Sequence, residues 1–102
     1  LIEDAYTQAK QFAPMTKRAM NMIEVYPSQP QFYYYTGLAY NQLQQFKKAK
    51  DLLEMGMDYV VENKELEINF NIQLGEAYNG LGDFKKKDLF FSKANQLLKE
   101  KK

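Results

Sequence analysis

The sequence contains no cysteine, no histidine and no tryptophan. Without cysteine there are no disulfides and no thiolate nucleophiles, and the additional lack of histidine removes most zinc sites and the commonest general base. No apolar run approaches the ~20 residues that a helix needs to cross a bilayer, and no signal-peptide pattern is present. We therefore expect a chain without a membrane span and without most of the usual catalytic groups.

Hydrophobic residues, in contrast, are plentiful. They make up 45% of the 102 residues, and 15% of the residues are aromatic. A disordered chain lacks the apolar surface needed to offset the entropy of ordering, so this composition predicts one folded domain.

The net charge is +1, but the charges are unevenly distributed. Residues 84–102 carry seven lysines against Asp88 and Glu100. A lysine-rich end can face nucleic acid or anionic lipid. Here the lysines alternate with hydrophobic residues as they do on the solvated side of an amphipathic helix, and we do not expect a nucleic-acid partner.

One short pattern occurs three times: Ala-Tyr, followed by a phenylalanine six residues after the tyrosine. The successive pairs lie 34 and then 38 residues apart. An internal period of this kind is a stronger signal than any single motif. It predicts three units, about 1–29, 30–64 and 65–102, with the first truncated and the middle one extended. The copies are Ala5-Tyr6 with Phe12, Ala39-Tyr40 with Phe46, and Ala77-Tyr78 with Phe84.

Apolar residues recur at intervals of three and four along the chain, and no strand pattern competes with them. Pro14 disfavours a helical residue before it, so it should end one helix and begin another. Pro27 and Pro30 bound the next turn. Gly82 should cap the C-terminus of the fifth helix, and Asp83 should be the N-cap of the sixth. The sequence thus predicts an all-α fold of six antiparallel helices in three helix-turn-helix hairpins, over about 1–12, 14–26, 30–43, 46–62, 65–81 and 83–99.

The three units resemble the tetratricopeptide repeat, whose pattern is a large residue, then Leu-Gly, Tyr, Ala, an aromatic residue and a closing proline. The resemblance implies a right-handed superhelix of stacked hairpins and identifies the chain as a three-repeat fragment of a longer protein. The pattern has departures: Glu3 replaces a glycine and Lys87 replaces an alanine. The matching residues are Ile2, Tyr6, Phe12, Ala19, Met22 and Pro27 in the first unit, Tyr33, Thr36, Gly37, Tyr40, Phe46, Ala49, Leu53 and Gly56 in the second, and Asn71, Leu74, Gly75, Tyr78, Phe84, Phe91 and Ala94 in the third.

Three structural expectations follow from this register. Tyr40 and Tyr78 should be core residues, and Gly37 and Gly75 should mark the close contact between the two helices of their hairpins. The four extra residues of the 38-residue interval amount to about one helical turn. Because the apolar pattern continues on both sides of Asn63, the fourth and fifth helices should each be extended rather than joined by a long loop.

The resemblance also implies a function, since tetratricopeptide repeats bind protein segments in a concave groove lined by the first helix of each hairpin. Asn41 and Asn79 occupy the same position in successive units, and an amide can both donate to and accept from a peptide backbone. The alternative is that any solvated helix face carries such residues. The expected groove residues are Tyr34, Leu38, Asn41, Gln42, Asn69, Ile72, Glu76 and Asn79.

One subfamily can be tested by position, namely the repeats that clamp a carboxylate tail with lysine, arginine and asparagine. The corresponding positions here hold Asp4, Tyr35, Asn69 and Gln73. The clamp is absent, so we do not expect an acidic C-terminal tail to bind by that mechanism.

No catalytic, metal or cofactor site is predicted. The carboxylates of Asp51, Glu54 and Asp58, and those of Glu62, Glu65 and Glu67, are typical of solvating charge on helices and turns. The segment Gly80-Leu81-Gly82 lacks the third glycine and the preceding strand of a phosphate-binding loop, and it reads as a helix end.

A second class of function is structural. The chain could be a spacing or self-associating segment of a longer array, with no ligand of its own. The apolar residues of the C-terminal helix exceed what one hairpin interface uses, so this helix is where a second copy or a neighbouring repeat would dock. These residues are Phe90, Phe91, Leu97 and Leu98. The lack of cysteine fits a bacterial cytoplasm and a periplasm equally.

Overall fold

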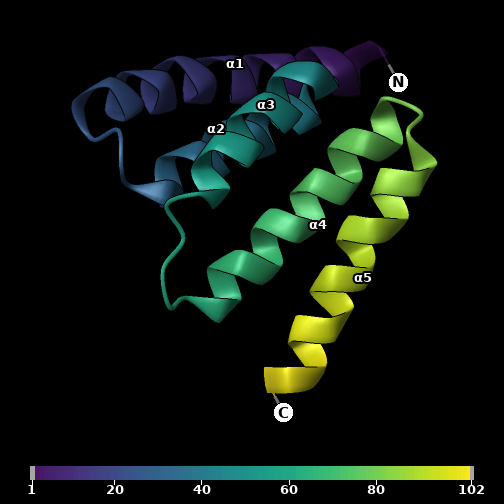
Figure 1. Ribbon diagram of the computed structural model, residues 1–102. Coiled ribbons are helices and arrows are strands. Elements are labelled where there is room, and N and C mark those ends of the chain that lie inside the picture. Colours follow the sequence, from purple (N-terminus) through teal and green to yellow (C-terminus); the bar gives the residue numbers. More distant parts are fainter. Residues whose placement is uncertain (1, 102) are drawn as a thin grey trace.

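The computed structural model describes the backbone of residues 2–101 and the side chains of residues 14–100. Within that range the chain forms five α-helices and no β-strand: α1 (Ile2–Val25), α2 (Pro30–Gln42), α3 (Phe46–Met57), α4 (Lys64–Gly80) and α5 (Phe84–Lys101). Each helix packs against the next one in the chain, and α4 also contacts α2 (Figure 1). The predicted all-α class is confirmed.

The predicted helix end at Pro14 is wrong, because α1 continues through this residue. Proline removes one backbone hydrogen bond and is unfavourable inside a helix by ~3 kcal/mol, but it does not by itself supply a turn. Residues 10–19 contain no glycine, asparagine or aspartate to form one. The described chain therefore has five helices rather than six, and the hairpin predicted for residues 1–29 is a single helix. The side chains of Ala5, Tyr6 and Phe12 lie outside the described ones.

The extension predicted around Asn63 occurs on one side only. Helix α4 has 17 residues against 13 in α2, as expected, whereas α3 ends at Met57 and residues 58–63 form a connection. Val60 and Val61 of this connection are β-branched and therefore weak helix formers, and Glu62 has a left-handed backbone with φ 49°. The side chain of Asn63 then accepts a hydrogen bond from the backbone N–H of Leu66 (3.0 Å) and caps α4.

The hairpins α2–α3 and α4–α5 have the same turn, 38 residues apart. The middle residue of each turn is left-handed, Gln44 with φ 61° and Gly82 with φ 79°, as expected for Gly82. The predicted cap at Asp83 is also confirmed, since its side chain accepts from the N–H of Lys86 (3.2 Å). The matching backbone N–H to O=C bonds are Leu43 to Ala39 and Leu81 to Ala77 (both 3.0 Å), Gln44 to Asn41 (3.0 Å) and Gly82 to Asn79 (3.1 Å), and Gln45 to Tyr40 (2.8 Å) and Asp83 to Tyr78 (2.9 Å).

The predicted close contacts at two glycines are confirmed. A β-carbon added to Gly37 of α2 would overlap the side chain of Leu53 in α3, and one added to Gly75 of α4 would overlap the ring of Phe91 in α5. Gly75 and Phe91 lie 38 residues after Gly37 and Leu53, so each hairpin closes through the same pair of positions. We call residues of the two hairpins that are 38 positions apart equivalent.

The core joins both hairpins. Tyr78 is 4% exposed, as predicted for a core residue, whereas Tyr40 is only half-buried and packs against the core from its edge. The central buried residues are Tyr33, Ala49, Leu53, Phe70, Leu74, Ala77 and Tyr78.

We expect the substitution Gly75→Leu to lower the free energy of unfolding by about 1–3 kcal/mol, because overpacking against Phe91 outweighs the ~1 kcal/mol gained in helix propensity. The matched control is Glu76→Leu, which places the same side chain at the next, exposed position of α4 and should change stability by about 0.5 kcal/mol or less. Urea titration followed by circular dichroism measures both, and equal stabilities of the two variants would contradict the close contact.

Candidate binding surfaces

The eight residues predicted to line a groove divide equally between α2 and α4, which contact each other. The structure therefore brings the two predicted halves together. Of these eight, Gln42, Glu76 and Asn79 are exposed, and Asn41 is buried. The half-buried residues are Tyr34, Leu38, Asn69 and Ile72.

Asn41 connects α2 to α4, a role that its position in the sequence did not indicate. It is 8% exposed, and its Nδ2 donates to the backbone carbonyl and to the side-chain Oε1 of Gln73, both at 3.0 Å. The amide thus ties α2 to the backbone of α4. Asn41 was expected to line the groove, but its amide is buried in the contact between α2 and α4 and is not available to a peptide.

Tyr34, which is half-buried, also packs against α4. Its ring centroid lies 5.7 Å from that of Phe70 in α4, and burial, followed by the neighbouring Tyr35, raises the pKa of its hydroxyl. A contact between residues so far apart in sequence carries no local pattern, so sequence reasoning had no signal for it.

In the α4–α5 hairpin, the residues equivalent to those that hold α4 in place are exposed. The ring of Phe46 lies against Gly80 of α4, so closely that a β-carbon on Gly80 would overlap it, whereas the equivalent Phe84 is 57% exposed. Asn79, equivalent to Asn41, is also exposed. Asn79, Phe84 and Lys87 form what we call the end face of the α4–α5 hairpin, and Lys87 is equivalent to the buried Ala49.

The side chains predicted for self-association are mostly used inside the hairpin. Phe91 packs against Gly75, and the ring of Phe90 stacks on that of Tyr78 with centroids 5.5 Å apart. Leu97 is half-buried, and Leu98 is 44% exposed.

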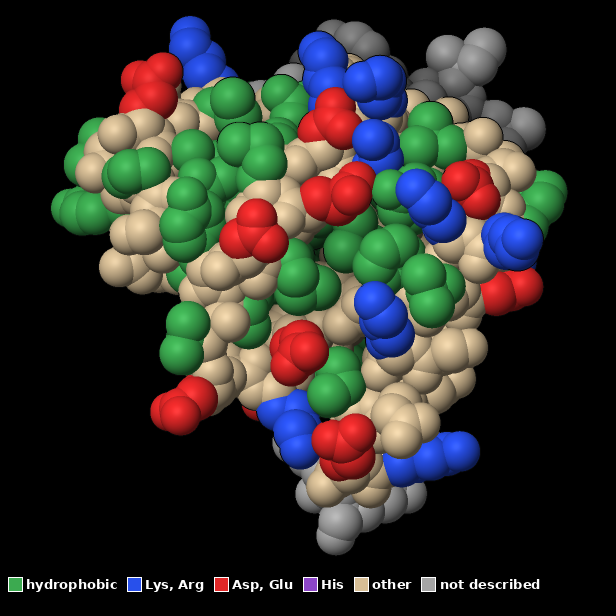
Figure 2. All heavy atoms as spheres, in the orientation of Figure 1, with side chains coloured by type: hydrophobic (Ala, Val, Ile, Leu, Met, Phe, Trp, Pro, Cys, Tyr) green, Lys and Arg blue, Asp and Glu red, His purple; other side chains and the backbone are tan. Residues whose placement is uncertain are grey.

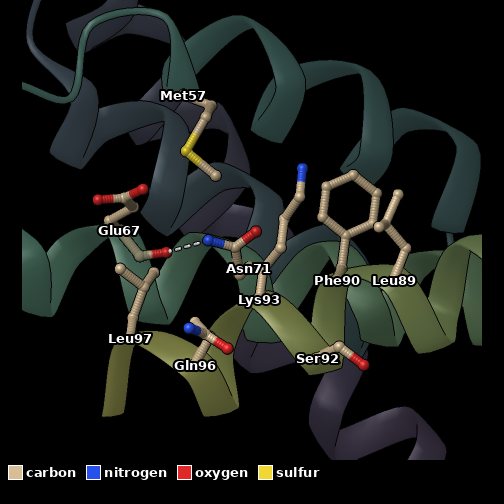
Figure 3. A pocket seen from close by; sticks show the side chains of 9 residues that line it. All are labelled: Met57, Glu67, Asn71, Leu89, Phe90, Ser92, Lys93, Gln96 and Leu97. Atoms are coloured by element: carbon tan, nitrogen blue, oxygen red, sulfur yellow. Dashed lines mark hydrogen bonds between the residues drawn. The ribbon is translucent and has the colours of Figure 1, made fainter. Parts of the chain in front are cut away.

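A hollow of about 500 Å³ lies between α4 and α5, closed on one side by Met57 of α3 (Figure 3). Asn71 projects into it from α4 and is 2% exposed. Its Nδ2 donates to the carbonyl oxygen of Glu67 (2.9 Å), while its Oδ1 is buried and has no hydrogen-bond partner in the described part of the chain. The lining residues are Met57, Glu67, Asn71, Leu89, Phe90, Ser92, Lys93, Gln96 and Leu97.

The hairpin α2–α3 shows what is missing from this hollow. The equivalent of Asn71 is Tyr33, whose ring stacks on Tyr59 with centroids 5.7 Å apart and whose hydroxyl donates to the carbonyl of Pro27 (2.7 Å). The hairpin α4–α5 thus has a small amide where its neighbour has a phenol ring. Asn71 at the position of a large residue was the sequence signal, but the open space beside it could not be read from the sequence.

Two of the carboxylates considered as catalytic candidates, Asp51 and Glu54, make ordinary structural contacts. Glu54 accepts a hydrogen bond from the hydroxyl of Tyr78 (2.9 Å) and pairs with Lys50 (3.7 Å), and Lys50 also pairs with Asp51 (2.9 Å). Burial, followed by the hydrogen bond to Glu54, raises the pKa of Tyr78 to about 12. Among the described residues, no group of three acidic side chains could hold a metal ion.

Charged side chains of both signs are interspersed over α3, α4 and α5, as Figure 2 shows for one face of the molecule. Several lysines in this region have an acidic partner, such as Lys64 with Glu100 (3.4 Å). The surface seen here has no continuous positive stripe of the kind that tracks a phosphate backbone. Of the helices described, none combines the length and the hydrophobicity that a membrane crossing requires.

Comparison with known proteins adds no relative. No protein family matches the chain, and neither the curated proteins nor the solved structures include a significant match.

The raised pKa of Tyr78 predicts a loss of stability at alkaline pH. As the pH rises above 10.0, the ordinary pKa of a tyrosine, the unfolded chain releases this proton before the folded chain does. The stabilisation is therefore complete below pH 10 and is lost as the pH rises towards 12. This loss of stability with rising pH should be absent from the variant Tyr78→Phe, which has no hydroxyl to titrate.

The measurement is the difference in free energy of unfolding between the native sequence and Tyr78→Phe, obtained by urea titration from pH 8 to 12. We expect about 1 kcal/mol in favour of the native sequence at pH 8, from the hydrogen bond to Glu54, and a shrinking or reversed difference above pH 10. Using the difference removes the contribution of lysines and other tyrosines that titrate in the same range. A difference that is constant with pH would contradict the raised pKa.

Proposed function

We propose that this chain is a non-enzymatic protein-binding scaffold, and that its end face binds an α-helical segment of a partner protein. The observation that carries the proposal is internal to the molecule. Hairpin α2–α3 holds α4 through Asn41 and Phe46, whereas the equivalent Asn79 and Phe84 of the α4–α5 hairpin are exposed. The ammonium group of Lys87 lies over the Phe84 ring, 5.3 Å from its centroid.

The contacts of α4 with Asn41 and Phe46 indicate what kind of partner helix would fit the end face. Phe46 requires a glycine beneath its ring, here Gly80, and Asn41 requires an accessible backbone carbonyl, here that of Gln73. A helix docked on the end face would present a glycine to Phe84 and a carbonyl to Asn79 in the same way.

The end face differs in charge from the equivalent surface of hairpin α2–α3. Lys87 replaces the fully buried Ala49, and residues 84–102 are rich in lysine. A partner helix that carries glutamate or aspartate is therefore favoured over a basic one. Helix α4 itself is of this kind, with Glu65, Glu67 and Glu76 against Lys64.

The resemblance to tetratricopeptide repeats supports the same reading. Two hairpins share their turn, their left-handed turn residue and their glycine contact at equivalent positions, which is what stacked repeats of this kind require. In this proposal the chain is part of a superhelical array, and the exposed Gln42 and Glu76 extend the contact surface along α2 and α4. Asn41 and Tyr34 have no direct role in binding.

Self-association through α5 is the second candidate, favoured by the exposure of Leu89 and Leu98 on that helix. The two candidates use different residues, because the end face is defined by Asn79, Phe84 and Lys87. They can therefore be separated by substitution.

The test uses α4 as its own template. A synthetic peptide with the sequence of residues 64–83, labelled with fluorescein, should bind the intact chain with a Kd of about 10–100 μM, typical of a short segment that orders on binding. The double variant Asn79→Ala, Phe84→Ala should bind at least about tenfold more weakly, since both contacts are lost. Fluorescence anisotropy measures the affinity.

Two controls make the result specific. Asn21→Ala removes the same amide from an exposed position of α1 and should leave the affinity unchanged. A peptide with leucine in place of Gly80 should fail to bind, because its side chain would meet the ring of Phe84. Unchanged binding by the double variant would refute the end face as the site. Sedimentation that shows a dimer abolished by Leu98→Glu would favour self-association instead.

A further inference from the structure

We propose that the hollow between α4 and α5 is a binding site for a phenol ring, whose hydroxyl donates a hydrogen bond to Oδ1 of Asn71. Neither the predicted groove nor the end face includes this site. It rests on two observations, the unpaired amide oxygen and the ring that fills the equivalent space in the other hairpin.

The first observation fixes what a ligand has to bring. The carbonyl of Glu67 can only accept, so the atom of Asn71 that faces it is the Nδ2 donor, and the remaining Oδ1 is an acceptor. In Figure 3 this oxygen lies on the side of the amide away from Glu67. A buried acceptor without a partner is destabilising, and a ligand with a hydroxyl donor would satisfy it.

The second observation gives the shape of the ligand. Tyr33 fills the equivalent position of α2–α3 with a phenol ring that stacks on Tyr59 and donates its hydroxyl to a carbonyl. In α4–α5 the residue equivalent to Tyr59 is Leu97, which lines the hollow together with Phe90 and Met57. These three apolar side chains offer a ring the same kind of surface, and the volume of about 500 Å³ is in the range of small-ligand pockets.

Entry of the ring requires one lining side chain to move. Oδ1 of Asn71 is out of reach of solvent in the empty hollow, and the most adaptable lining residue is Lys93. Its ammonium group lies 5.3 Å from the centroid of the Phe90 ring, and the residue is exposed. A lysine has a long flexible stem and exchanges a surface contact of this kind at little cost.

The test compares two rings that differ only in the group on the oxygen, a hydrogen in one and a methyl in the other. p-Cresol has the hydroxyl donor, whereas 4-methylanisole has the same ring with a methyl ether that cannot donate. Titration of the ¹⁵N-labelled chain should give a Kd on the order of 1 mM for p-cresol and at least about tenfold weaker binding for 4-methylanisole. The amide shifts should concentrate at Glu67, Asn71 and residues 89–97. Equal affinity for the two rings, or shifts located elsewhere, would overturn the proposal.

A variant that fills the hollow from within provides an independent test. Asn71→Tyr restores the residue type found at Tyr33 and should abolish p-cresol binding. Glu76→Tyr adds the same side chain at an exposed position of α4 outside the hollow and should leave binding unchanged. Undiminished p-cresol binding by folded Asn71→Tyr would also overturn the assignment. The comparison of the two rings on the native sequence needs no variant to fold.

A phenol ring can come from a free small molecule or from a tyrosine of another polypeptide. The capped tripeptide acetyl-Gly-Tyr-Gly-amide, titrated in the same way, distinguishes these sources. Binding tighter than that of p-cresol assigns the site to a polypeptide tyrosine, and weaker binding assigns it to a small phenol. Failure of both to bind would leave the hollow as a packing defect and refute the site, whatever the result with the α4 peptide.

Discussion

The fold depends on the close approach of large side chains to helix backbones at glycine. Four glycines inside helices, Gly37, Gly56, Gly75 and Gly80, each lie against a leucine or an aromatic ring of a neighbouring helix at a distance that leaves no room for a β-carbon. Glycine inside a helix is unfavourable by up to ~1 kcal/mol relative to alanine, so each position is justified only by the contact it permits. Gly37 and Gly75 close the hairpins, Gly56 lies against Tyr33 of its own hairpin and Phe70 of the next, and Gly80 joins α4 to Phe46 of the hairpin before it.

The contacts between the hairpins depend on polar groups as well. Asn41 spans the gap between α2 and α4 with a bond to a main-chain carbonyl, which requires the two helices to approach closely at that point. Its own Oδ1 is buried without a partner in the described residues, as is that of Asn71. A buried unpaired oxygen is tolerated when the rest of the amide is satisfied, and at Asn71 it also lies at the hollow between α4 and α5.

The candidate functions arise from differences between equivalent positions. Where the hairpins agree, as at Gly37 and Gly75, the residues maintain the fold. Where they differ in burial, as at Asn41 and Asn79, the same residue type is structural in one hairpin and accessible in the other. Where they differ in residue type, as at Tyr33 and Asn71, a filled interior becomes an open one.

The sequence by itself determined the all-helical class, the hairpin turn at Gly82 and Asp83, the glycine contacts and the burial of Tyr78. These follow from local spacing and turn chemistry, which act between residues close in the chain. The continuity of α1 through Pro14 and the end of α3 at Met57 were decided by the folded structure, because a proline or a weak helix former sets only a preference. The tertiary structure alone decided that Asn41 holds α4 while Asn79 is exposed, and that space remains beside Asn71. Both depend on which helix lies across each position, and that is set by packing between helices, for which the local pattern carries no information.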